Sequence, residues 1–193
     1  HLALNAPRFD TSAVERVRGQ IMAGLKHEMK NPDAIGGRVF AEKAFPDHPY
    51  GRAVHGTLNS IPQISRDDLI ALKQRIIARD NLIIGIVGAI DEHAAAAAVD
   101  HVFGGLPAHA LLDPVQDIAF SATGARFGID FDIPQSVIMF GRQGIPRDDD
   151  DFIPAMVANH IFGGGVFQSR LFKEVREKRG LTYSVYSSLA SYD

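Results

Sequence analysis

Amphipathic helical patterns and short runs of β-branched residues alternate along this chain. From Val14 to Met29 apolar residues recur at three- and four-residue steps, which is the spacing of one face of an α-helix. The run from Leu82 to Gly88 is short, apolar and rich in isoleucine, which suits a buried strand better than a helix. From Ala125 to Ile145 the pattern is also strand-like, with apolar residues alternating with Gly and Asp. The fold must therefore accommodate helices and strands together.

Capping residues mark the ends of the expected helices. Ser12 with Glu15, and Ser65 with Asp68, each place a hydroxyl before a helix and an acid three positions further on. Pro32 ends the first helix, because proline disfavours helical geometry in the residue before it. Further helices are expected from Asp33 to about Phe45, from Asp91 to the glycines at 104–105, and from the acidic run 148–151 to Phe162. A last helix is expected from Gln168 to Arg179, with Gly180 as its cap. A strand should follow from Tyr183 to Ala190.

A stretch without periodicity divides the chain. Residues 106–117 contain two prolines and no helical or strand-like repeat, which marks a connector between domains. The chain opens at His1 without a Met or a signal-like segment and stops directly after a strand-like run, so we expect it to be an excised fragment.

Composition excludes several classes of function. The formal net charge is -3 and the chain lacks the basic surface of a nucleic-acid binder, so no nucleic-acid partner is expected. With no cysteine, disulfides, thiolate zinc sites and cysteine nucleophiles are excluded. The longest apolar stretches fall short of the roughly 20 residues that a membrane span needs, so no span is expected. The compartment stays open, periplasmic or cytoplasmic for a bacterial protein.

The eight histidines do not form a recognisable metal motif. None are spaced at i and i+4, and His27-Glu28 begins like a zincin motif but has Asn31 where the second histidine would stand. No metal ligand and no catalytic residue is therefore predicted in this chain. Gly163-Gly164-Gly165 lacks the Gly-Lys-Ser/Thr of a nucleotide loop and follows a helix, so we interpret it as a sharp bend between helices.

Two blocks of sequence motifs, which together cover nearly the whole chain, occur in the same order as the motifs of a known family. They consist of residues 162–165, 169–172 and 175–185 in the first block, and of residues 31–32, 45–52, 56–57 and 64–69 in the second. Both blocks resemble the pitrilysin/insulinase family of zinc peptidases, which includes the mitochondrial processing peptidases.

The resemblance implies an α+β fold. Members have two homologous lobes that face each other like a clamshell, each with mixed β-sheets and helices packed on one face, with zinc on the first lobe and substrate-binding groups on the second. By this comparison, residues 1–107 are the latter part of the first lobe, 108–119 a linker and 120–193 the start of the second lobe, so each lobe is incomplete.

The resemblance also implies that this chain is not catalytic. Family peptidases bind zinc through an inverted His-x-x-Glu-His motif, which would lie before His1, and a glutamate on a downstream helix. That glutamate is expected on the helix before Asn31-Pro32, where the comparison places Gly24. Glu15 and Glu28 lie on the same helix but not at the family's distance from the proline. A site without its third protein ligand would lose affinity and water activation, so zinc is expected on a catalytic partner and no cofactor in this chain.

Arg176 and Tyr183 match the spacing of a family Arg-Tyr pair that hydrogen-bonds the peptide substrate near the scissile bond. A guanidinium and a phenol can both donate to a peptide carbonyl or a developing oxyanion. The resemblance therefore implies a subunit of a heterodimeric peptidase, supplying substrate binding to a zinc-bearing partner of the same family. Two alternatives stay open: a structural scaffold subunit without proteolytic role, and a fragment of an active zinc endopeptidase whose glutamate lies elsewhere.

Overall fold

A computed structural model describes residues 1–191 of the chain. The chain divides into two compact units, which are described separately here. The first unit comprises His1–Ile118 and Gly128–Ile138. The second comprises Ala119–Phe127 and Met139–Asp193.

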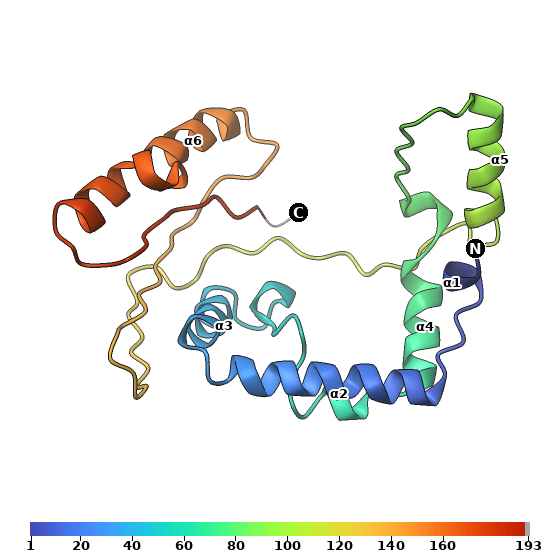
Figure 1. Cartoon of the computed structure of the whole chain (residues 1–193), viewed down its shortest axis with the longest axis horizontal. Coiled ribbons are helices and arrows are strands. Elements are labelled where there is room, and N and C mark those ends of the chain that lie inside the picture. Colours follow the sequence, from blue (N-terminus) through green and yellow to red (C-terminus); the bar gives the residue numbers. More distant parts are fainter. Residues whose placement is uncertain (192–193) are drawn as a thin grey trace. The chain divides into compact units, whose positions relative to one another are not determined.

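The regular secondary structure of the first unit is helical (Figure 1). Two of them begin at strong caps. The Asn31 side chain accepts hydrogen bonds from the backbone N–H groups of Asp33 and Ala34, and the Ser65 and Asp68 side chains form a reciprocal capping box. The elements are α1 (Leu2–Asn5), α2 (Thr11–Glu28), α3 (Pro32–Ala44), η1 (Pro49–Gly51), η2 (Ile61–Gln63), α4 (Arg66–Ile76), η3 (Arg79–Asn81) and α5 (Glu92–Phe103).

Side chains from α2 and from the loop after α3 hold the first unit together. Arg18 on α2 donates to the carbonyl of Ile61 and, at 2.8 Å, to the carbonyl of Ile64. His48 is buried, and its Nε2 lies 2.8 Å from the carbonyl of Gln116 while its Nδ1 accepts from the backbone N–H of Tyr50 at 3.3 Å. These two contacts define which ring nitrogen carries the proton, because a carbonyl only accepts and a backbone N–H only donates.

The expected connector lies against the end of α4. The backbone N–H of Arg79 donates to the carbonyl of Pro107 at 2.8 Å, and the N–H of Leu111 donates to the carbonyl of Arg75 at 2.8 Å. Asp80 accepts from the N–H of Ala110 at 3.0 Å. These bonds attach residues 107–111 to the helical part of the first unit.

The second unit is a column of helical turns followed by an extended return segment (Figure 1). The π-helical turn η4 (His160–Gly164) follows α6 (Phe152–Asn159) directly. The chain then bends at Val166, whose φ of 44° is unusual for a β-branched residue, and η5 (Val166–Gln168) leads to a second π-helical turn, η6 (Phe172–Glu177). Residues 181–191 run back along this column without regular structure.

The expected α+β architecture of mixed sheets is wrong for residues 1–191, because this part of the chain contains helices and no strand. The three segments predicted as strands, residues 82–88, 125–145 and 183–190, lack regular secondary structure. A strand is stabilised by hydrogen bonds and side-chain packing against a neighbouring strand, so β-branched composition alone does not create one. Ile83 and Val87 illustrate the missing neighbour, since they are 100% and 102% exposed.

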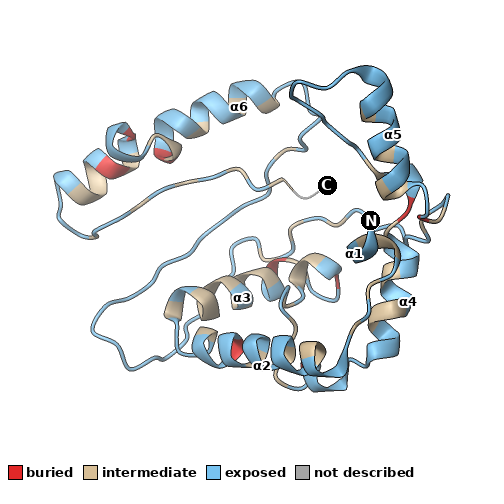
Figure 2. Cartoon of the chain, turned by 45° about the vertical axis from the view of Figure 1, so that its right-hand side comes forward, coloured by how far each residue is buried: buried red, intermediate tan, exposed pale blue. Residues whose placement is uncertain are grey.

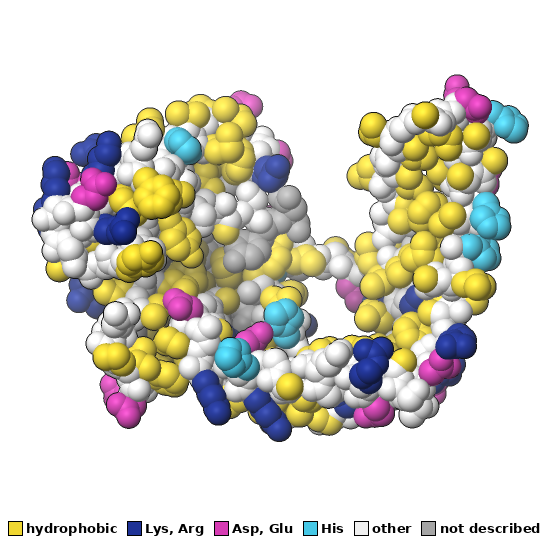
Figure 3. All heavy atoms as spheres, viewed as in Figure 1, with side chains coloured by type: hydrophobic (Ala, Val, Ile, Leu, Met, Phe, Trp, Pro, Cys, Tyr) yellow, Lys and Arg dark blue, Asp and Glu magenta, His cyan; other side chains and the backbone are white. Residues whose placement is uncertain are grey.

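Little of the apolar surface is buried. Many large hydrophobic side chains within the described residues are exposed, among them Ile83, Val87 and Ile138. Buried positions are correspondingly few (Figure 2), and hydrophobic side chains gather over α5 and the extended segment before it (Figure 3). The buried hydrophobic residues are Leu25, Ala44, Ile61, Ala78, Leu106 and Phe172.

Candidate functional site

A glycine turn at the end of η6 sends the chain back along the helix. Gly180 has a φ of +62°, which glycine adopts without strain. Its N–H donates to the carbonyl of Arg176 at 2.9 Å, and the N–H of Leu181 donates to the carbonyl of Val175 at 3.1 Å. The bond from Gly180 to Arg176, four residues earlier, together with the positive φ of Gly180, is the αL cap, and it confirms Gly180 as the predicted cap. The turn brings the residues after it back toward η6.

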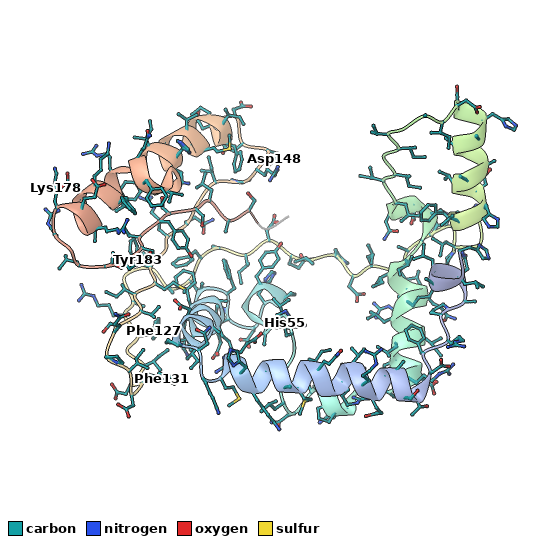
Figure 4. All side chains as sticks on the ribbon, viewed as in Figure 1. His55, Phe127, Phe131, Asp148, Lys178 and Tyr183 are labelled. Atoms are coloured by element: carbon teal, nitrogen blue, oxygen red, sulfur yellow. The ribbon has the colours of Figure 1, made fainter. Side chains whose placement is uncertain are left out.

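Arg176 lies close to two aromatic rings. Its guanidinium carbon is 4.6 Å from the ring centre of Phe172 and 5.0 Å from that of Tyr183. Phe172 is only 5% exposed, whereas Tyr183 is 86% exposed on the return segment (Figure 4). The structure therefore brings the two predicted site residues together, with the arginine close to both a buried ring and an exposed phenol.

Glu174 pairs with the two cations that follow Arg176, Lys178 and Arg179. Glu174 accepts from Lys178 at 2.5 Å and from Arg179 at 3.2 Å. These hydrogen bonds, the one from Lys178 first, lower the pKa of the Glu174 carboxyl. None of the ion pairs within residues 1–191 involves Arg176. Its guanidinium therefore keeps its hydrogen-bond donors for another acceptor.

Ser169 fixes the start of the turn that carries the arginine. It is 1% exposed, its hydroxyl donates to the carbonyl of Val166 at 2.8 Å, and its oxygen accepts from the N–H of Phe172 at 3.3 Å. Phe167 packs edge-on against Phe172 at 5.1 Å. The sequence interpretation missed Ser169 because it began this helix at Gln168; a serine three residues before a buried phenylalanine was the available signal.

The triple glycine has a different role from the one predicted. None of its three residues has a positive φ, and the helix continues through Gly164 as a π-turn. A Cβ at Gly163 would lie 2.3 Å from the hydroxyl oxygen of Ser187 and 2.6 Å from its backbone nitrogen. Glycine is required here because the return segment passes directly over the helix, and the sharp bend itself occurs at Val166.

The position where the family glutamate was expected holds no ligand group. Gly24 lies on α2, and a Cβ there would meet no atom within 4 Å. The nearby carboxylates are paired, Glu15 with Arg18 at 3.2 Å and Glu28 with His55 at 3.1 Å. Across the described residues, no group of three or more His, Asp or Glu side chains could hold a metal ion.

Comparison with known proteins identifies the family. The sequence profile of the family described as "Peptidase M16 inactive domain" matches residues 63–193, which is more than half of the chain. This chain belongs to the M16 inactive-domain family. The resemblance to pitrilysin/insulinase-type peptidases is thereby confirmed, with the chain as a non-catalytic domain of that family.

Relatives of this M16 domain are longer than the chain. An uncharacterized zinc protease of Mycobacterium leprae is 28% identical over 91% of this chain and 40% of its own length. A non-peptidase homolog of Helicobacter pylori is 26% identical over 95% of this chain and 42% of its length. The crystal structure of a peptidase M16 inactive domain from Pseudomonas fluorescens matches with a TM-score of 0.80 and 30% identity over 97% of this chain and 45% of that one. The chain thus spans less than half of these relatives.

One further structural finding concerns membranes. Within residues 1–191, no helix combines the length and the apolar character that crossing a bilayer requires.

Proposed function

We propose that this M16 domain binds a peptide substrate through Arg176 and Tyr183 and presents it to a zinc site on a catalytic partner of the same family. The observation that carries the proposal is the stack in which Arg176 lies 4.6 Å from Phe172 and 5.0 Å from Tyr183. Two donors of different kinds, a guanidinium and a phenol, stand side by side on one exposed surface. Both can donate to the carbonyl of an extended peptide or to the oxyanion that forms during its hydrolysis.

The surroundings of Arg176 support this role. A buried phenylalanine ring limits the conformations of the guanidinium, so less entropy is lost when it binds substrate. The neighbouring Lys178 and Arg179 are engaged by Glu174, whereas Arg176 takes part in none of the ion pairs within residues 1–191. A positioned, unpaired arginine suits recognition of a carbonyl or carboxylate.

The proposed partner would supply the zinc chemistry. Peptide hydrolysis by this family needs a zinc-bound water, and Gly24 contributes no ligand where the third protein ligand was expected. Zinc is therefore assigned to the partner, and this chain to positioning of the substrate. The name of the Helicobacter pylori relative, a non-peptidase homolog, fits a role without independent catalysis.

A scaffold role without proteolysis is the second candidate. The observation that favours it is the exposed apolar surface, since large hydrophobic side chains such as Ile83 and Val87 are fully exposed and offer area for assembly. The third candidate, a fragment of an active endopeptidase, is favoured by the relatives named as zinc proteases. Stoichiometric zinc in the full-length protein purified alone would select this third candidate.

Peptide hydrolysis by the complex tests the proposal. The full-length protein is assayed with the zinc peptidase subunit that co-purifies with it. Arg176→Ala and Tyr183→Phe should each lower kcat/KM by roughly 10²-fold, the loss typical of one donor to a developing oxyanion. Arg179→Ala and Tyr186→Phe are matched controls, because they remove the same groups from neighbouring positions, and both should leave kcat/KM within about twofold of wild type.

Unchanged hydrolysis in the two variants would contradict the proposal. If Arg176→Ala and Tyr183→Phe leave hydrolysis by the complex unchanged, the pair does not bind substrate. The scaffold role would then be the better description of this chain.

A further inference from the structure

The return segment that carries Tyr183 is fastened to the helical column at a second point. The hydroxyl of Ser187 donates to Oδ1 of Asn159 at 2.7 Å, and Nδ2 of Asn159 donates to the carbonyl of Ser187 at 3.3 Å. Both contacts are part-buried. One side chain at the end of α6 therefore holds both the side chain and the backbone of a single residue on the return segment.

Two glycines make room for this contact. A Cβ at Gly163 would stand 2.3 Å from Oγ and 2.6 Å from the backbone N of Ser187, and Gly163 is itself buried. A Cβ at Gly164 would stand 2.9 Å from Nδ2 of Asn159. All three distances are shorter than van der Waals contact, and the two at Gly163 mean that any side chain there must displace the return segment.

The π-turn places these groups at one spot. The turn η4 begins at the residue after Asn159, and the N–H of Gly165 donates to the carbonyl of His160 at 2.8 Å, five residues earlier. Turns of this kind are rare and occur frequently at functional sites. At this turn Gly163 lies directly against Ser187, and Asn159 hydrogen-bonds the same residue.

We propose that Asn159, Gly163 and Ser187 form a clasp that positions Tyr183 over Arg176. The αL cap at Gly180 fixes one end of the segment, and the clasp fixes the other. Since an extended residue spans at most about 3.3–3.6 Å, the few residues between these points have little freedom to move away from the helix. The three clasp residues are positioning residues, and their effect on catalysis rests on the proposed function of the Arg176–Tyr183 pair.

Two clasp variants perturb the segment to different degrees. Ser187→Ala removes the hydroxyl contact but keeps the contact of Asn159 to the backbone, so kcat/KM of the complex should fall several-fold. Gly163→Ala pushes the segment away and should lower kcat/KM by about 10²-fold, the loss that a displacement of about 1 Å produces in a positioned group. Ser188→Ala and Gly144→Ala are the controls. Ser188 is the exposed neighbour of Ser187, a Cβ at Gly144 meets no atom within 4 Å, and neither change should alter kcat/KM.

A spectroscopic measurement separates positioning from general destabilisation. The Arg176 Nε–H resonance of the full-length protein is followed by NMR, because the Tyr183 ring shifts the signals of the guanidinium above it. Tyr183→Leu provides the reference without the ring. In Ser187→Ala and Gly163→Ala the resonance should move toward this reference, and in Ser188→Ala and Gly144→Ala it should stay at the wild-type position.

Each result decides one question. An Arg176 resonance that does not move in either Ser187→Ala or Gly163→Ala overturns the clasp, even if Arg176→Ala and Tyr183→Phe still abolish hydrolysis. A resonance that moves while hydrolysis is insensitive to Arg176→Ala supports the clasp and overturns the proposed function. The third case is a complex whose hydrolysis does depend on Arg176. If the clasp variants then move the resonance but leave kcat/KM unchanged, the positioning role is overturned.

Discussion

Replacing Phe172 with leucine tests whether its ring holds Arg176 in place. The guanidinium carbon of Arg176 lies 4.6 Å from the Phe172 ring centre, and the ring is buried. Leucine keeps most of the apolar volume but removes the aromatic face, so the change isolates the contact with the cation from the burial of the side chain.

The structure sets the size of the effect. Arg176 is half-buried, so its contact with Phe172 should contribute near the lower end of the range for cation–π pairs, about 0.5–1 kcal/mol. Phe172→Leu alone should cost somewhat more, because the edge-on contact with Phe167 is also lost, adding about 0.5–1.5 kcal/mol. A double-mutant cycle with Arg176→Gln separates the two contributions, since only the first involves the guanidinium.

Amide hydrogen exchange measures this coupling locally. The N–H groups of Gly180 and Leu181 close the turn after η6, so their protection reports the free energy of opening that turn without assuming that the whole protein unfolds as one unit. Losing the Arg176–Phe172 contact should lower their protection roughly two- to fivefold. A control cycle pairs Phe167→Leu with Arg176→Gln and should be additive. A Phe172–Arg176 coupling below about 0.3 kcal/mol, the scatter of independent sites, would refute the reasoning.

Two further predictions concern helix caps. Asn31→Ala should destabilise α3 by about 1 kcal/mol, because the N–H groups of Asp33 and Ala34 lose their acceptor; chemical unfolding of the full-length protein measures this, and an unchanged midpoint would contradict it. At α4, the backbone N–H and then the hydroxyl of Ser65 lower the pKa of Asp68. The Asp68 carboxylate therefore stabilises α4 fully above the ordinary aspartate pKa of about 3.9, and this contribution is lost as pH falls through the lowered value. The stability difference between wild type and Asp68→Ala should accordingly shrink in acid, and a pH-independent difference would count against the capping box.

Helix ends were predictable where a cap uses local chemistry. Ser65 with Asp68, and Gly180 after η6, act as the sequence predicts, because each depends only on residues a few positions apart. The predicted cap at Ser12 is wrong. The helix begins at Thr11 after Asp10, without a side-chain cap, so a serine followed three residues later by an acid does not suffice when the backbone enters the helix earlier.

Strands were not predictable from the same local patterns. Residues 82–88 have the β-branched composition of a buried strand, yet they remain extended and exposed. Composition reports that a segment fits a pleated, packed surface; it does not supply the neighbouring strand that the surface needs. This is why the α+β expectation fails within residues 1–191 while most of the helix predictions succeed.

The candidate site also has a part that the sequence could predict and a part that it could not. Periodicity could not distinguish Arg176 from any other charge on a solvated helix, and only the family resemblance singled it out together with Tyr183. Phe172 and Ser169 hold the pair through contacts three or four positions apart, whereas Ser187 acts through Asn159, 28 positions away. Such long-range packing leaves no signal in a local sequence pattern.

The extended segment around Ile83 and Val87 has a practical consequence for any reconstitution with a peptidase. Proteolytic nicking concentrates where the backbone is exposed and outside regular structure, as it is here. An active partner can thus cut this chain as well as the added peptide, and the two cleavages must be separated by following the intact mass of both. If residues 82–88 resist cutting in the full-length protein, the exposed surface around Ile83 and Val87 is covered there by other parts of the protein or its partner.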